Sequence, residues 1–159
     1  MTDGIRGARI AVLGDTHDGG GDPDAMLKEL GPILEGAGAI LHTGDVSSAA
    51  MLDRLETFAP VLAVRSSEDP ELPPRLVDGP RSIEWDGLRI ELHRVLSDED
   101  LVERDGVDVV VHGGTHRPSV TTAGRTIYVN PGAPVFADTP SAGLLELARG
   151  RIRATLIFL

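Results

Sequence analysis

The feature that most constrains this fold is the order of apolar and polar segments in the first sixty-five residues. Short apolar runs at 10–13, 39–41 and 61–64 alternate with two helix-like segments, 25–34 and 49–58. Each run ends in a polar loop, and a helix-capping residue precedes each helix-like segment. This order predicts a β-α-β-α-β unit, in which right-handed crossovers bring the loops after the strands to one edge of a sheet. A functional site is therefore expected at that edge.

Hairpin signals dominate the second half of the chain. Asp86-Gly87, Ala123-Gly124 and Arg149-Gly150 each separate two runs of strand-forming residues. A short helix is expected from Ser97 to about Arg104. Parallel strands followed by hairpins predict an α/β protein in which two sheets pack face to face with helices outside. The strands expected in this half are 81–85, 88–92, 107–111, 119–122, 125–129, 143–148 and 152–158.

Composition excludes several classes of protein. The chain has 15 basic and 25 acidic residues, a net charge of −10 and 3% aromatic residues, so a nucleic-acid partner is not expected. It has no cysteine, so any metal must be bound by His, Asp, Glu or Asn side chains. The length of 159 residues, the mean hydropathy of −0.01 and a short polar N-terminus predict one cytoplasmic domain, residues 1–159, without membrane association. Homo-oligomerisation stays open.

All five histidines lie at or just after the end of an expected strand, where loops build sites. Asp15 and His17 are two residues apart, so an extended chain points both side chains at one cation. Asp45 follows the neighbouring strand, and His116 follows the most apolar strand of the chain. This mixture of carboxylate and imidazole groups suits Mn, Fe, Ni or Zn better than Ca or Mg.

These residues also have simpler interpretations. A Gly-Asp pair after a strand is often only a turn or a helix cap, and His42 and His112 fit packed groups behind the ligands better than ligands. Asn130-Pro131-Gly132 fits a tight turn as well as a loop that lines a site. Arg65 is suited to bind a phosphate anion, but an exposed arginine without a role explains it nearly as well.

The order of these motifs resembles that of the calcineurin-like metallophosphoesterases, in particular their small single-domain prokaryotic phosphodiesterases. In that family the strands end in Asp-x-His, Gly-Asp, Gly-Asn, a lone His and Gly-His-x-His, and the small members close with Asn-Pro-Gly. The resemblance implies a four-layer αββα sandwich of two mixed β-sheets flanked by helices. It also implies a two-metal site, where a metal-bound hydroxide attacks the phosphorus of a small phosphate ester. The matching segments here are Asp15-Thr16-His17, Gly44-Asp45, His93, Gly113-Gly114-Thr115-His116 and Asn130-Pro131-Gly132.

The same resemblance implies an intact first metal site and a degraded second one. Carried over residue by residue, the first ion is held by Asp15, His17, Asp45 and His116. The second ion shares Asp45 and keeps only His93, because Ser66-Ser67 stands where the family has Gly-Asn and Gly114 where it has His. The sequence leaves Glu68, Asp69 and His112 open as substitutes. The residues expected to act on the phosphate are Asp45, Arg65, His93 and Asn130.

Two functions follow from this pattern. The first is a phosphodiesterase or phosphomonoesterase with one firm divalent transition metal, Mn before Fe, Ni or Zn, that is slow because second-metal ligands are missing. The second is a degenerate member of the family that binds or scaffolds without catalysis. The intact first ligand set favours the hydrolase, and the two losses favour the scaffold. An unrelated metal enzyme or sensor is the remaining alternative.

Overall fold

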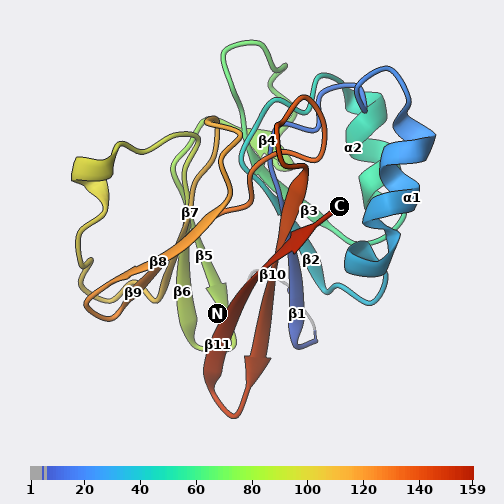
Figure 1. Ribbon diagram of the computed structural model, residues 1–159. Helices are drawn as coiled ribbons and strands as arrows, with labels where there is room; N and C mark the ends of the chain where they lie inside the picture. The colour runs from blue at the N-terminus through green and yellow to red at the C-terminus, as the bar shows by residue number, and fades with distance from the viewer. Residues whose placement is uncertain (1–4, 6) are drawn as a thin grey trace.

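Two β-sheets pack face to face in the computed structural model, which describes residue 5 and residues 7–159 (Figure 1). The first sheet has the strand order β11-β10-β1-β2-β3-β4, and the second has the order β5-β6-β7-β9-β8. The strands of the first sheet are β1 (Arg9–Leu13), β2 (Ala39–His42), β3 (Val61–Val64), β4 (Leu76–Val77), β10 (Ser141–Ala148) and β11 (Arg151–Phe158). Those of the second sheet are β5 (Arg81–Trp85), β6 (Leu88–Leu92), β7 (Val109–Val111), β8 (Ser119–Ala123) and β9 (Thr126–Asn130). Both sheets contain parallel and antiparallel pairs, so the predicted sandwich of two mixed sheets is confirmed.

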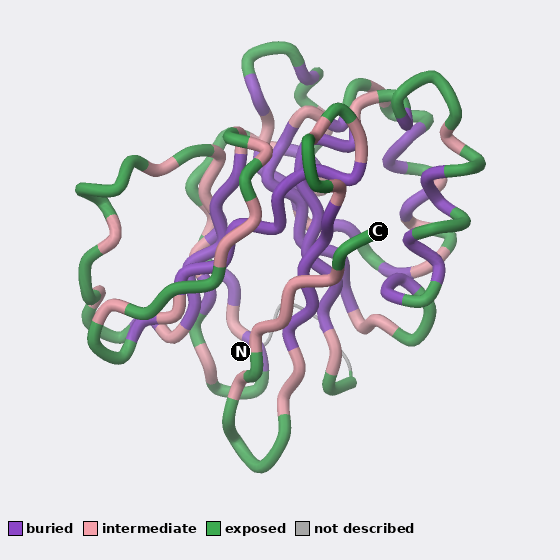
Figure 2. Tube along the Cα trace, viewed as in Figure 1, coloured by how far each residue is buried: buried purple, intermediate pink, exposed green. Residues whose placement is uncertain are grey.

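Both α-helices cover the outer face of the first sheet. Helix α1 (Pro23–Leu34) and helix α2 (Ala49–Glu56) begin where the side chains of Asp22 and Ser48 cap backbone N–H groups of the first turn. Successive residues of β1 point to opposite faces, so Leu13 packs under the helices while Val12 packs between the sheets. Figure 2 shows that the buried residues gather in the strands and on the inner faces of the helices.

The outer face of the second sheet has a thinner cover. Within the described part of the chain, the segment between β6 and β7 contains only a 3-10 helix, η1 (Asp98–Asp100), where a helix to about Arg104 was expected. The chain leaves helical geometry at Leu101, and the Tyr128 hydroxyl donates to the backbone carbonyls of Asp100 and Val102. A helix to Arg104 would join the Asp100 carbonyl to the Arg104 N–H, but here that carbonyl accepts from Tyr128 and the Arg104 N–H donates to Thr126 Oγ1.

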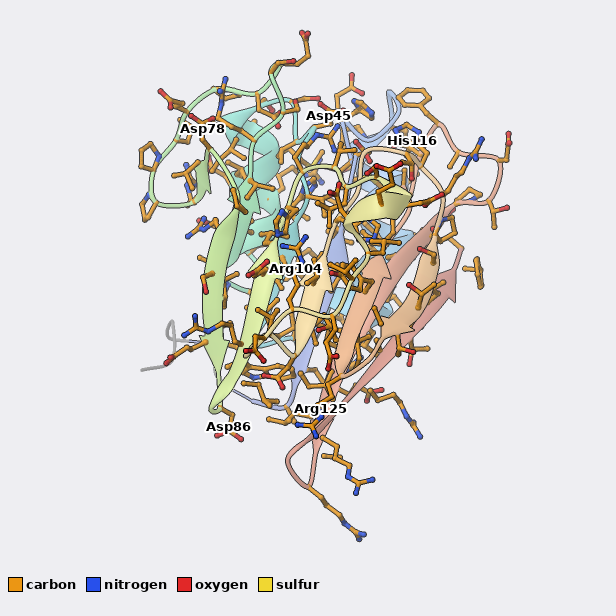
Figure 3. The ribbon with its side chains drawn as sticks, turned by 90° about the vertical axis from the view of Figure 1, so that its left-hand side faces the viewer. Asp45, Asp78, Asp86, Arg104, His116 and Arg125 are labelled. Atoms are coloured by element: carbon orange, nitrogen blue, oxygen red, sulfur yellow. The ribbon has the colours of Figure 1, made fainter. Side chains whose placement is uncertain are left out.

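Strand direction determines where a site can form. Strands β1, β2 and β3 are parallel to one another, and so are β6, β7 and β9 in the second sheet. The loops that follow these strands meet at one end of the sandwich, where Figure 3 shows Asp45 and His116, whereas Asp86 and Arg125 lie at the opposite end. In the described residues, neither helix has both the length and the apolar character to cross a membrane.

Candidate metal centre

Asp15, His17 and His116 converge at this end of the sandwich. Each offers one ligand atom, and the three atoms lie within 4.8 Å of one another. Asp15 and His17 come from the loop after β1, and His116 comes from the loop after β7. One carboxylate and two imidazoles form a donor set that suits a first-row transition metal ion.

The backbone of this end is strained. Asp15, His17, Asp45 and His116 have φ values of 48°, 47°, 58° and 59°, a left-handed conformation that side chains disfavour. Hydrogen bonds between the two loops hold it, since the Asp15 N–H donates to the Gly44 carbonyl (2.9 Å) and the His17 N–H donates to the Asp45 carbonyl (2.8 Å). Strain of this kind persists only where surrounding structure enforces it, and it gathers at functional sites.

A buried histidine braces the two loops from behind. His42 Nδ1 accepts a hydrogen bond from the Gly44 N–H (3.0 Å), so the proton is on Nε2, which donates to Thr16 Oγ1 (2.9 Å). Complete burial lowers the pKa of His42 to about 4, against the opposing charge of Asp69. The neutral ring therefore holds Thr16, between Asp15 and His17, and Gly44, next to Asp45.

A backbone carbonyl determines which nitrogen of His116 faces the centre. His116 Nδ1 donates to the Phe136 carbonyl (3.1 Å), which leaves the lone pair of Nε2 on the side of Asp15 Oδ2, 3.8 Å away. Metal-binding histidines are commonly oriented in this way by an acceptor on the far nitrogen. The Phe136 ring is 67% exposed and meets the His17 ring edge-on, with the centroids 5.5 Å apart.

The two carboxylates differ in their environment. Asp15 is fully buried, and burial raises its pKa despite the nearby Arg94 charge, while a hydrogen bond with Asp45 acts in the same direction as burial. Burial also acts to raise the pKa of Asp45, but the Ser66 hydrogen bond and Arg94 outweigh it, so that pKa is lowered. Asp15 Oδ1 lies 3.1 Å from Arg94 Nη2 without hydrogen-bond geometry, and Asp15 Oδ2 lies 3.8 Å from His116 Nε2. A buried carboxylate beside two imidazoles fits a bound cation.

Asp45, expected as a ligand of the first ion, is not one of the three converging residues and pairs instead with an arginine that the sequence analysis did not single out. Arg94 Nη2 lies 2.8 Å from Asp45 Oδ2 and 3.1 Å from Asp15 Oδ1. The signal was available, because Arg94 continues the alternation of Ile90 and Leu92, whose side chains pack between the sheets.

The His93 side chain points away from the three converging residues and toward Glu91. It follows Glu91 in the alternation, and its Nε2 lies 3.0 Å from Glu91 Oε1, on the side of the sheet opposite to the metal group. Arg104 Nη1 also reaches Glu91 Oε1, at 3.0 Å. The structure therefore does not bring His93 together with Asp15, His17 and His116.

Arg65 and Asn130 also lie outside the group of converging ligand atoms. Arg65 donates from Nε and Nη2 to the Asp69 carbonyl and from Nη1 to Asp78. Asn130 accepts from the Gly132 N–H (2.9 Å) and donates to Thr115 Oγ1 (3.0 Å). Asn130 thus joins its own turn to the loop that carries His116.

The three substitutes that the sequence left open do not reach the group either. Asp69 is buried and accepts four backbone N–H groups, those of Asp45, Val46, Ser47 and Ser66, at 2.8 to 3.1 Å. Glu68 is exposed. His112 is buried beside Tyr128, with both ring nitrogens unpartnered among the described residues, and burial lowers its pKa.

The family is decided by a comparison with known domain families. Residues 9–150 match the model of the calcineurin-like phosphoesterase superfamily domain. The chain belongs to this superfamily.

Relatives of this calcineurin-like chain agree with that assignment. A protein of Methanocaldococcus jannaschii named "Probable metallophosphoesterase" is 29% identical over 168 residues, which cover 93% of this chain and 80% of that protein. A solved structure described as a novel archaeal phosphodiesterase has a TM-score of 0.73 at 20% identity, over 94% of this chain and 99% of that one. Vps29 of Entamoeba histolytica, solved with Zn²⁺, has a TM-score of 0.67 at 20% identity, over 94% of this chain and 98% of that one. The two structures share the fold.

Proposed function

We propose that this calcineurin-like protein hydrolyses a small phosphate ester, a diester or a monoester, with one divalent transition metal ion held by Asp15, His17 and His116. The observation that carries the proposal is the convergence of these three ligand atoms within 4.8 Å on a strained backbone. Mn²⁺ is the first candidate ion, followed by Fe, Ni and Zn. The archaeal phosphodiesterase structure with the same fold supports the ester as substrate.

The chain prepares this centre in three ways. The Phe136 carbonyl orients the His116 ring through Nδ1 so that Nε2 faces the centre, and the His42 brace holds the Asp15 and Asp45 loops together. Burial of Asp15 disfavours the bare carboxylate and so favours a bound cation. A divalent ion bound there supplies positive charge for a phosphate oxygen and acidifies a water molecule. The organic part of the ester has room in a cavity of about 420 Å³ lined by His116, Phe136 and Thr139 among others.

The experiment uses two chromogenic esters and one matched pair of variants. Metal-free protein receives Mn²⁺, Fe²⁺, Ni²⁺ or Zn²⁺ in turn, and release of p-nitrophenol is followed from bis(p-nitrophenyl) phosphate and from p-nitrophenyl phosphate. Asp15→Asn should abolish metal-dependent turnover because it removes the central carboxylate. Asp86→Asn makes the same chemical change at the opposite end of the sandwich, at a positive φ that Asn tolerates, and should leave turnover unchanged.

A binding or scaffold role without catalysis is the second candidate. It is favoured by the fold shared with Vps29 and by the absence of the second family ligand set at Ser67 and Gly114. This role predicts that the wild-type protein binds metal but hydrolyses neither ester faster than its Asp15→Asn variant. Turnover by the wild type well above that variant would exclude it.

A further inference from the structure

The guanidinium of Arg94 lies between the two acidic residues of the candidate centre. Its Nη2 is 2.8 Å from Asp45 Oδ2 and 3.1 Å from Asp15 Oδ1, and its Nη1 is 3.3 Å from the Thr43 carbonyl oxygen. Two carboxylate oxygens and one carbonyl oxygen thus surround one fixed positive charge. These are the oxygen ligands that a hard divalent cation would take.

Two glycines, Gly44 and Gly114, leave space for the Arg94 side chain because they have no Cβ atom. A Cβ atom added at Gly44 would lie 2.8 Å from Arg94 Cδ, and one added at Gly114 would lie 3.3 Å from Arg94 Nη1 and would also clash with Val95. Gly114 is the position where the family motif has a histidine. A histidine there would therefore compete for the space that Arg94 occupies.

The other groups that would hold a second ion are not assembled. His93 turns away to Glu91, Asp69 binds four backbone N–H groups, and Ser67 is exposed. Asp15 and Asp45 each place one carboxylate oxygen at this position, and both oxygens contact Arg94. The residues present do not fit a second metal ion beside Arg94.

We infer that the Arg94 guanidinium replaces the second metal ion of the family. It neutralises Asp45 with a charge that belongs to the protein, and its side chain is 24% exposed, so solvent and a ligand can reach it. The three contacts use at most three of its five N–H donors. Since this part rests on the proposed function, a phosphoryl oxygen of the substrate is the acceptor assigned to a remaining donor.

Metal stoichiometry tests the replacement without any substrate. The full chain is stripped with a chelator and titrated with Mn²⁺ by calorimetry, with the bound metal counted after gel filtration. The wild type should bind one ion per chain. Arg94→Ala should bind more than one at saturating Mn²⁺, because the three oxygens lose their cation, whereas Arg94→Lys and the distant Arg125→Ala should stay at one. Arg94→Gln, which keeps most of the length but not the charge, decides in the same way if Arg94→Ala does not fold.

Two results would overturn the replacement: a wild type that holds two ions at full occupancy, or an uncharged Arg94 variant that stays at one ion. The phosphate contact has its own measurement, the affinity of the Mn²⁺-loaded protein for inorganic phosphate. Arg94→Ala should weaken it about 10- to 100-fold, as expected for a charged hydrogen bond, and Arg94→Lys should recover part of the loss. An unchanged phosphate affinity in Arg94→Ala would show that Arg94 does not contact the phosphate.

These measurements separate this inference from the proposed function. One ion in the wild type and extra ions in Arg94→Ala, together with no ester hydrolysis, would keep the replacement and reject the hydrolase. Ester hydrolysis by a wild type that binds two ions would support the hydrolase and reject the replacement.

Discussion

The two ends of the sandwich reach the same unusual backbone conformation for different reasons. At the end far from the centre, Asp86 and Arg149 have positive φ values of 51° and 54° in hairpin turns, each followed by a glycine. At the metal end, Asp15 and Asp45 have similar φ values, but bonds between separate loops enforce them. Strain that a local turn explains is a feature of the hairpin. Strain that tertiary contacts impose marks the place where side chains must be held for a purpose.

Removing the acceptor that holds the Asp45 loop should have the largest effect. Asp69→Ala leaves four backbone N–H groups without their carboxylate, and we expect the free energy of unfolding to fall by about 3–5 kcal/mol. Asp108→Ala is the matched control, because the Asp108 carboxylate accepts only the Arg89 N–H in the described structure, and its loss should cost about 1 kcal/mol. Urea denaturation of both metal-free variants measures the difference. Equal losses would mean that the metal end is no more dependent on its acceptor than the far end.

The His42 brace predicts a pH dependence of stability. The unfolded chain takes up a proton near the usual pKa of 6.5, whereas folded His42 does so only near a pKa of about 4. The unfolded state therefore binds more protons between these values, so the metal-free protein should lose roughly 3 kcal/mol as the pH falls from 6.5 to 4, at about 1.4 kcal/mol for each unit.

His42→Asn tests this dependence because Asn keeps an acceptor near Nδ1 and cannot titrate. The variant should lose less stability than the wild type over the same pH range, measured by urea denaturation in the presence of a chelator. Identical slopes for the two proteins would show that His42 does not carry the difference.

Relief of backbone strain should have the smallest effect. Arg149→Gly, in the hairpin between β10 and β11, should raise the free energy of unfolding by about 0.5–1 kcal/mol, because glycine adopts positive φ without the side-chain cost. His17→Gly should change the stability of the metal-free protein by no more than about 1 kcal/mol but should lose metal binding. Thermal denaturation with and without Mn²⁺ measures both. Stabilisation by Mn²⁺ that survived in His17→Gly would contradict the proposed ligand set.

Most of what the sequence predicts about this fold and site follows from the order of its strands and from the residues at their ends. The alternation of apolar runs with helix-like segments predicted the mixed sheets, and the position of Asp15, His17 and His116 after their strands led to the group that the fold assembles. These features depend on local pattern and on the crossover rule, both of which a sequence displays. The family expected from the motif order is confirmed by the match to residues 9–150.

What the sequence analysis missed depends on which side of a strand a residue occupies. A difference of one position decides that Arg94 faces the centre and that His93 faces Glu91. The thin layer over the second sheet depends on a contact between Tyr128 and carbonyls almost thirty residues earlier, which no local pattern reveals. Arg65 and Asn130 are of types suited to bind phosphate, but the structure uses their polar groups to hold loops.

The hydrogen bond from His116 to the main chain at Phe136 separates two properties that many sites combine. The acceptor is a carbonyl, which every amino acid at position 136 would supply, whereas the ring above His17 belongs to this phenylalanine alone. A replacement at position 136 that keeps the loop conformation would change the surface offered to an incoming molecule and leave the imidazole in the same orientation. Selectivity and metal affinity can therefore diverge independently in descendants of this chain.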